Sequence, residues 1–365
     1  TTIIQAHASP NTATDRVFEI STGVTSTVQD LTVRHGKISG KGGGFNISDS
    51  TQMTLMRVTL TDNAGYDGGG ISFSGDSSTL TITDCTFTGN TGYVGGGISF
   101  FGDSTSTSNF ISTLRITGCT FTNNNATYDG GAISFFGDSS TLTIIDCTFT
   151  DSNGYLGGAI SFFRDSTTST SILIITNCTF TNNNADYGGG ISFFGDSTTT
   201  STSTLTITDC TFTNNNATNW GGAIYFSGDL FTSTITGCTF TNNNAKWGGA
   251  INSSGASSNL FVTNSIFDNN EANDQGGHVF AFQGNSTFEN SSFVNGIASS
   301  GGAVSLKHAT STLKNCTINA NSAGSEGGGI FDDDNDNDIT IINCTISNNS
   351  SGNNGGGLRL INNSG

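Results

Sequence analysis

Apolar and polar residues alternate along most of the chain in short segments with a period of two. The alternation is clear at residues 71–73, 80–82 and 85–87. Because successive side chains of a β-strand point to opposite faces, each segment predicts a short strand with one buried face. No 3.6-residue period is present, and weak helix formers such as Thr, Ser, Gly and Asn fill the intervals. The pattern therefore predicts an all-β chain.

Three columns of residues recur along the chain at intervals of 25 to 35 residues. A Gly-Gly-(Gly/Ala)-apolar motif, with His278 in the third position once, ends on Phe45, Ile71, Ile98, Ile133, Ile160, Ile191, Ile224, Ile251, Val279, Val304, Ile330 and Leu358. A motif of the form apolar-x-apolar-x-x-Cys-Thr-Phe-Thr-x-Asn has its Cys position filled by Leu31, Val58, Cys85, Cys119, Cys147, Cys178, Cys210, Cys238, Ser265, Ser291, Cys316 and Cys344. Two residues later stand Val33, Leu60, Phe87, Phe121, Phe149, Phe180, Phe212, Phe240, Phe267, Phe293, Ile318 and Ile346. Such an internal repeat indicates a solenoid.

One extra residue between the two strands of the second motif breaks the alternation and predicts a sharp bend. This position is occupied by Asp84, Gly118, Asp146, Asn177, Asp209 and Gly237. Asp, Asn and Gly tolerate the left-handed backbone that such a bend requires. The glycine pairs mark a further corner. Asn residues three positions after the Phe column predict a ladder of amides bonded from coil to coil: Asn90, Asn124, Asn183, Asn215, Asn243 and Asn270.

Three strands and three corners in about 27 residues make one coil of a solenoid, and stacking of coils at about 4.8 Å buries the apolar stripe. The predicted fold is a right-handed, single-stranded parallel β-helix of about twelve coils, with three short strands per coil. Residues 1–27 fit the repeat poorly and are expected to form a lead-in or cap, with a candidate strand at residues 17–20. Residues 28–365 are expected to form the repeat domain.

The paired motifs also carry a family resemblance. Gly-Gly-Ala-Ile at residues 130–133 with Phe-x-x-Asn at 121–124, and the same pair at 221–224 and 212–215, resemble the repeats of chlamydial polymorphic outer membrane proteins. The resemblance covers about residues 28–361 and implies a passenger-type surface β-helix, often adhesive. The carboxyl-terminal barrel of that family is not found in this sequence, so the resemblance does not support outer-membrane anchoring.

The charge of the chain limits the classes of partner that it can bind. The chain carries a net charge of -17 with only 11 Lys and Arg residues, so nucleic acid and anionic membrane surfaces are poor partners. No apolar run is long enough to predict a membrane span. Low Lys content and many Asn-x-Ser/Thr sequences suit an extracellular or cell-surface protein. Because the last coil shows no amphipathic cap, self-association through the solenoid ends into a fibre is also expected.

The eight cysteines all fall in one inward column: Cys85, Cys119, Cys147, Cys178, Cys210, Cys238, Cys316 and Cys344. No Cys-x-x-Cys spacing indicates a metal site. Two interpretations stay open, namely disulfides between neighbouring coils and a column of buried free thiols. Replacement by Leu, Val and Ser in the same column favours the packing role.

Thr residues flank the Phe column on the outer face of the same strand. They form a two-wide array of Thr86, Thr88, Thr120, Thr122, Thr148, Thr150, Thr179, Thr181, Thr211, Thr213, Thr239 and Thr241. Thr-x-Thr arrays on flat β-helix faces resemble those of ice-binding proteins. The competing interpretation is that Thr is simply a good residue for an exposed strand.

Two further sets of residues are candidate sites. Alternate carboxylates at Asp332, Asp334, Asp336 and Asp338 suit a Ca²⁺ ion, although a solvated acidic turn has the same sequence pattern. No other cofactor is indicated. Candidate N-glycosylation sites are Asn125, Asn216, Asn252 and Asn285.

The sequence favours a structural or adhesive cell-surface protein with glycans or other surface ligands as partners. No pair of carboxylates and no clustered base indicates catalysis, so the chain is expected not to be an enzyme. Ice binding by the Thr array is the alternative function. Carbohydrate binding or polysaccharide cleavage is the third.

Overall fold

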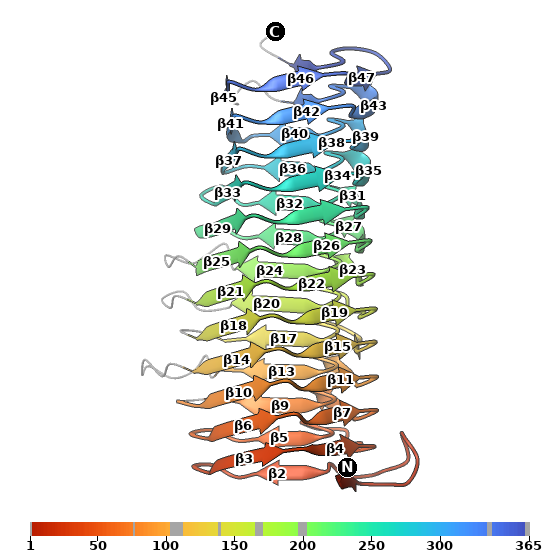
Figure 1. The fold of residues 1–365 in the computed structure, drawn as a ribbon, viewed down its shortest axis with the longest axis vertical. Coiled ribbons are helices and arrows are strands. Elements are labelled where there is room, and N and C mark those ends of the chain that lie inside the picture. The colour runs from red at the N-terminus through yellow and green to blue at the C-terminus, as the bar shows by residue number, and fades with distance from the viewer. Residues whose placement is uncertain are drawn as a thin grey trace. The chain divides into compact units, whose positions relative to one another are not determined.

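Parallel β-strands make up the regular structure of this chain. The computed structural model describes residues 2–75, 77–102, 112–137, 140–164, 171–195, 203–333 and 338–361. These residues form two compact units, 1–185 and 186–365. Figure 1 shows the strands of each unit, and no helix is present in the described ranges. No segment there is therefore a helix long and apolar enough to cross a membrane.

The first unit contains three long sheets and one short one, whose strands follow in spatial order. Sheet A contains β1 (Thr2–Gln5), β4 (Leu31–Arg34), β7 (Thr59–Thr61), β11 (Thr86–Thr88), β15 (Thr120–Thr122), β19 (Thr148–Thr150) and β22 (Thr179–Thr181). Sheet B contains β2 (Phe18–Ile20), β5 (Phe45–Ile47), β9 (Ile71–Ser74), β13 (Ile98–Phe101), β17 (Ile133–Phe136) and β20 (Ile160–Arg164). Sheet C contains β3 (Thr25–Gln29), β6 (Gln52–Met56), β10 (Thr79–Thr83), β14 (Thr113–Thr117), β18 (Thr141–Ile145) and β21 (Ile172–Thr176). Sheet D contains β8 (Ala64–Asp67), β12 (Thr91–Val94) and β16 (Asn125–Ala126).

The second unit repeats this arrangement. Its sheet A contains β26 (Thr211–Thr213), β30 (Thr239–Thr241), β34 (Ile266–Asp268), β38 (Ser292–Val294), β42 (Thr317–Asn319) and β46 (Thr345–Ser347). Sheet B contains β24 (Ile191–Gly195), β28 (Ile224–Ser227), β32 (Ile251–Ser254), β36 (Val279–Phe282), β40 (Val304–Lys307), β44 (Ile330–Asp332) and β48 (Leu358–Leu360). Sheet C contains β25 (Ser203–Thr208), β29 (Phe231–Thr236), β33 (Asn259–Thr263), β37 (Asn285–Glu289), β41 (Thr310–Lys314) and β45 (Ile339–Ile342). Sheet D contains β27 (Asn216–Trp220), β31 (Asn244–Trp247), β35 (Glu271–Gln275), β39 (Ile297–Ser300), β43 (Ser322–Glu326) and β47 (Ser350–Ser351), while β23 (Asn184–Tyr187) spans residues of both units.

Parallel pairing in register places each residue above its counterpart in the next coil. In sheet A of the first unit, Phe87 pairs with Phe121, and Phe121 pairs with Phe149. Their rings stack at centroid distances of 4.6 and 4.8 Å, and all three side chains are fully buried. Burial of one such ring contributes about 1.5–3 kcal/mol. The predicted Phe column is thus the core of the coils.

The predicted bends adopt the left-handed backbone. Asp84 has φ of 52° and Asn177 has φ of 52°, and the glycines at this position are equally positive. The first glycine of each pair turns the next corner: Gly130 has φ of +61°, and a Cβ there would lie 2.0 Å from the carbonyl oxygen of Ile133. These positions explain why Asp, Asn and Gly fill the corners.

The structure adds two features that the alternation did not predict. Sheet D is a fourth strand position between the Asn column and the glycine pair, where Gly and Ala interrupt the apolar pattern, as at Gly92 and Ala126. Residues 2–29 also lie in register with the next coil, because β1 pairs with β4, β2 with β5 and β3 with β6. The candidate strand at residues 17–20 is confirmed as β2.

The predicted asparagine ladder is confirmed. Asn63 Nδ2 donates to Asn90 Oδ1 at 3.0 Å, and Asn90 Nδ2 donates to Asn124 Oδ1 at 3.0 Å. Asn215, Asn243 and Asn270 repeat the pattern in the second unit. The side chains are fully buried, so each amide satisfies its neighbour and the adjacent backbone, as buried polar groups require.

One rung of this ladder is built differently. Gly296 occupies the Asn position, and the buried imidazole of His278 fills the space left there, with its Nε2 2.6 Å from where a Cβ of residue 296 would be. Asn270 Nδ2 donates to His278 Nδ1 at 3.0 Å, and His278 Nε2 donates to Asn321 Oδ1 at 3.1 Å. His278 departs from the Gly-Gly-(Gly/Ala) motif and Gly296 departs from the Phe-x-x-Asn motif, and the two departures compensate each other.

This imidazole should make stability depend on pH. Burial lowers the pKa of His278 to about 4 from the usual value near 6.5. Between these two pH values the unfolded chain therefore binds a proton at this imidazole and the folded chain does not. Stability is lost as the pH falls from about 6.5 towards 4, on the order of 3 kcal/mol in total. Urea unfolding at about pH 7 and 4.5 should show a larger loss for the natural chain than for His278→Gln, which keeps a polar side chain that does not titrate. Gly296 stays unchanged in this variant, because a Cβ there would lie 2.3 Å from the Gly302 carbonyl oxygen. Equal losses in the two proteins would contradict this assignment.

Candidate functional site

A groove lies on the outer face of sheet B in the second unit, beside the ends of the sheet D strands. Its volume is about 270 Å³, near the lower end of ligand pockets in general. It is lined by Trp220, Trp247, Asn252, Ser254, Gln275, Phe280, Phe282 and Lys307. Sheet D provides the first two and Gln275, and sheet B provides the others.

The repeat places these side chains. Trp220 and Trp247 are the last residues of β27 and β31, immediately before the corner glycines Gly221 and Gly248. Asn252 pairs with Phe280 of the next coil, and both point away from the core because they alternate with buried residues. In four successive coils of the first unit the same outward position is filled by small buried serines, Ser72, Ser99, Ser134 and Ser161.

Aromatic rings form half of the lining of the groove. Trp220 and Trp247 lie 6.0 Å apart between ring centroids, and Trp220 also contacts the ring of Tyr225 at 5.4 Å. Tyr225 is buried, which raises the pKa of its phenol to about 12. On the other side, Phe280 and Phe282 have centroids 6.4 Å apart. These rings offer apolar faces beside polar groups.

The polar groups of the groove are mostly uncharged. Asn252 is only 2% exposed, and its Oδ1 has no hydrogen-bond partner in the described part of the chain. Gln275 Oε1 accepts a bond from Ser305 Oγ at 3.2 Å. Lys307 Nζ lies 3.3 Å from a carboxylate oxygen of Asp333, which offsets its charge.

A second hollow of about 330 Å³ adjoins the groove and is lined by Ala256, Gln283, Gly284 and His308. The His308 ring meets the Phe282 ring edge-on at 5.8 Å. Because Phe282 lines the first hollow and His308 the second, the two hollows lie side by side.

Comparison of the chain with protein families agrees with the sequence repeat and with the stacked parallel strands. A model of the right-handed β-helix region matches residues 11–125, 107–231 and 202–365. The chain belongs to the right-handed β-helix family. The predicted fold class is therefore confirmed as a right-handed parallel β-helix of about twelve coils. The finer resemblance to polymorphic outer membrane proteins has no support from this match.

No curated protein matches the chain. Among solved structures, this β-helix is similar to the A-module of the Azotobacter vinelandii mannuronan C-5 epimerase AlgE4, with 13% identity over 92% of this chain and 91% of that chain and a TM-score of 0.45. An enzyme is thus among the proteins with a similar β-helix, which contradicts the prediction that the chain is not an enzyme. The similarity assigns no activity to this chain.

The acidic candidate site is only partly within the described residues. Asp332 is a buried residue of β44, and Asp338 lies just before β45. Asp334 and Asp336 lie outside the described residues. Among those that are described, no group of three His, Cys, Asp or Glu side chains could hold a metal. Calcium binding stays a prediction.

The glycosylation candidates differ in exposure. Asn216 and Asn285 are exposed, and Asn125 is half-buried with its Oδ1 accepting a bond from Asn153 Nδ2 at 2.7 Å. Asn252 is buried in the groove, so its amide nitrogen is a poor acceptor for a glycan.

The Thr array lies in register on the outer face of sheet A. In the first unit Thr86, Thr120, Thr148 and Thr179 pair in sequence, as do Thr88, Thr122, Thr150 and Thr181. In the second unit Thr211 and Thr213 pair with Thr239 and Thr241, and the next coil replaces them by Ile266 and Asp268.

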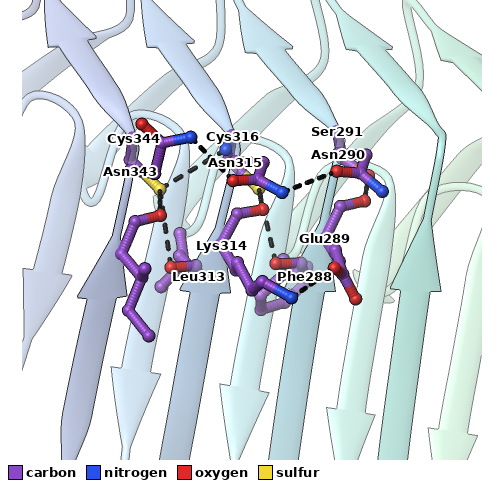
Figure 2. A network of polar contacts seen from close by, with 11 residues as sticks. Phe288, Glu289, Asn290, Ser291, Leu313, Lys314, Asn315, Cys316, Asn343 and Cys344 are labelled. Carbon is purple, nitrogen blue, oxygen red and sulfur yellow. Dashed lines mark hydrogen bonds and ion pairs between the residues drawn. The ribbon is translucent and has the colours of Figure 1, made fainter.

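The cysteine column consists of eight thiols that form no disulfide, seven of them buried and Cys344 partly exposed. Figure 2 shows its last two members, where the Cys316 amide donates to Cys344 Sγ at 3.4 Å and Cys316 Sγ contacts the Phe288 carbonyl oxygen at 3.4 Å. Outside them, Asn343 donates to Asn315, and Asn315 to Asn290, at 2.8 and 3.0 Å. Burial raises the pKa of the Cys316 thiol and so disfavours the reactive thiolate.

Thiol titration tests this arrangement. A disulfide reagent should react quickly with Cys344 alone in the native protein, since the other seven thiols are buried. All eight thiols should react after unfolding in guanidinium without reductant. A shortfall of two or more thiols in the unfolded sample would instead indicate disulfides.

The sequence pattern did not predict the groove, because the groove is built from residues that the repeats do not share. Its signal was a departure from the repeat: the residue after Gly-Gly-Ala-Ile is Ser in most early coils but Tyr225, Asn252 and Phe280 in three successive later ones. Both tryptophans of the chain, Trp220 and Trp247, also precede glycine pairs in neighbouring coils.

Proposed function

We propose that this protein is an extracellular or cell-surface β-helix that binds uncharged carbohydrate chains in the groove of its second unit. The single observation that carries the proposal is the combination of four aromatic rings with amide and hydroxyl groups in one hollow. The C–H faces of a sugar ring pack on aromatic faces, while its hydroxyls exchange hydrogen bonds with amides.

Charge selects the class of carbohydrate. The chain has a net charge of -17, and Lys307, the one cation among the described residues that line the groove, is paired with Asp333. A polyanionic chain would be repelled by this field, and it would have to draw Lys307 from Asp333, or Lys246 from its place 4.0 Å from the Trp247 ring centroid, to gain a positive partner. A neutral polysaccharide avoids both costs.

An extracellular location and an adhesive role fit the same proposal. The composition suits an exported protein, with few Lys and Arg and many Asn and Thr residues. A rigid repeat scaffold that presents one glycan-binding groove would attach its bearer to a glycan surface. Self-association of subunits into a fibre stays a separate prediction.

Tryptophan fluorescence provides a direct test, since the chain has two tryptophans and both line the groove. Titration with cellohexaose, xylohexaose or mannohexaose should change the emission with at least one of the three. Trp247→Ala should weaken that binding about tenfold or more, because a stacking face is lost. The matched control is Tyr93→Ala, which removes an exposed, stacked ring in the first unit and should leave affinity unchanged. No binding of any of the three sugars by the natural protein would refute the proposal.

A second candidate function is ice binding by the first unit, and the register of the Thr residues favours it. Strands β7, β11, β15, β19 and β22 each carry Thr-x-Thr, and each pair lies directly over the next. Spacings of about 4.8 Å between coils and 6.8 Å along a strand give a regular lattice of hydroxyl and methyl groups.

A freezing assay tests that candidate. Thr148→Tyr places a bulky ring in the middle of the Thr rows and should abolish any thermal hysteresis of the natural protein. Thr317→Tyr, on the same sheet where the next residue but one is Asn319, is the control and should have no effect. Absence of hysteresis in the natural protein would remove ice binding from consideration.

A further inference from the structure

Asn252 differs from the other polar side chains of the groove in having a buried oxygen with nothing to accept from. The residue lies in β32, is 2% exposed and lines the groove, yet its Oδ1 has no hydrogen-bond partner among the described residues. A carbonyl that is removed from water and left unpaired costs free energy, and native structures contain few of them.

The neighbours of Asn252 give no structural reason for an amide. At the same register position, the preceding coil has Tyr225 and the following coil has Phe280. Aromatic side chains therefore fit this row of sheet B in the coils on either side of Asn252. An amide between two aromatic rings loses stability unless something else completes its hydrogen bonds.

We propose that Asn252 is the specificity-determining acceptor of the groove, and that its Oδ1 receives a hydrogen bond from a hydroxyl or amide N–H of a neutral sugar. This inference rests on the carbohydrate-binding function proposed above. Trp220, Trp247 and Phe280 then pack on the sugar. Asn252 favours sugars that present a hydrogen-bond donor at one position of the ring. A carboxylate at that position cannot donate, so a uronic acid is disfavoured at this contact wherever its carboxylate faces Asn252, and the net charge disfavours it throughout.

The first unit contains a matched control. Asn46 occupies the equivalent position in β5, and its Oδ1 is likewise buried and unpaired. Its neighbours are Glu19 and Ser72 instead of aromatic rings, and its Nδ2 donates to Glu19 Oε1 at 2.8 Å. Asn46→Leu thus makes the same chemical change away from the groove.

The experiment compares Asn252→Leu with Asn46→Leu in the full chain. Affinity for the neutral hexasaccharide that binds the natural protein should fall about tenfold in Asn252→Leu, which corresponds to the loss of one hydrogen bond, and should not change in Asn46→Leu. The unfolding midpoint of Asn252→Leu should be equal to or higher than that of the natural protein, because an unpaired buried carbonyl is removed. Hexagalacturonate should bind the natural protein more weakly than the neutral sugar.

Each contrary outcome is decisive. Unchanged affinity in Asn252→Leu, or a lower unfolding midpoint with weaker binding, would overturn the role of Asn252 while the carbohydrate function stands. Binding of hexagalacturonate as tight as that of the neutral sugar would overturn the selection against charge. Failure of the natural protein to bind any neutral hexasaccharide would refute the proposed function itself, and with it this inference.

Discussion

Parallel pairing of strands in register is the constraint on which this molecule depends. Because each strand bonds to its counterpart one coil away, side chains of sheets A, B and C lie beside the residue at the same position of the repeat. Like then stacks on like, and the ring column of Phe87, Phe121 and Phe149 and the amide column of Asn63, Asn90 and Asn124 follow directly. Most core positions therefore hold the same residue type in successive coils, and this is why the sequence repeats.

The same constraint explains where residues can depart from the repeat. A substitution in one coil must be compatible with the coils on either side. It is therefore either compensated by a second substitution nearby or located where an unfilled space can hold a ligand. His278 and Gly296 illustrate compensation, since an imidazole takes the place of one missing asparagine in the ladder. Asn252 illustrates the second case, since its carbonyl lies unpaired beside aromatic rings at the edge of a hollow.

The sequence was sufficient for features that repeat and insufficient for features that occur once. The sequence predicted strands such as β9, β10 and β11, the left-handed corner at Asp84 and the Asn ladder. A pattern that recurs in about a dozen coils rarely arises by chance. Sheet D was missed because its pairing is carried by the backbone, with small residues such as Gly92 and Ala126 leaving no apolar alternation. The groove was missed because its walls come from four successive coils, and only the register shows that Trp247, Asn252 and Phe280 face one hollow.

The prediction that the chain is not an enzyme shows a limit of the same kind. It was based on the scarcity of paired carboxylates and basic residues in the sequence, but in a right-handed β-helix side chains of neighbouring coils, about 27 residues apart in the sequence, lie side by side. Function must therefore be judged from the face of the coils, where aromatic and uncharged polar side chains meet in the second unit.

The most direct test of this account is a crystal structure of the protein soaked with the neutral hexasaccharide that it binds. The account predicts a sugar ring packed against Trp220 or Trp247, with a hydroxyl or amide nitrogen within about 3 Å of Asn252 Oδ1. A sugar bound elsewhere on the chain, with the groove empty, would contradict it.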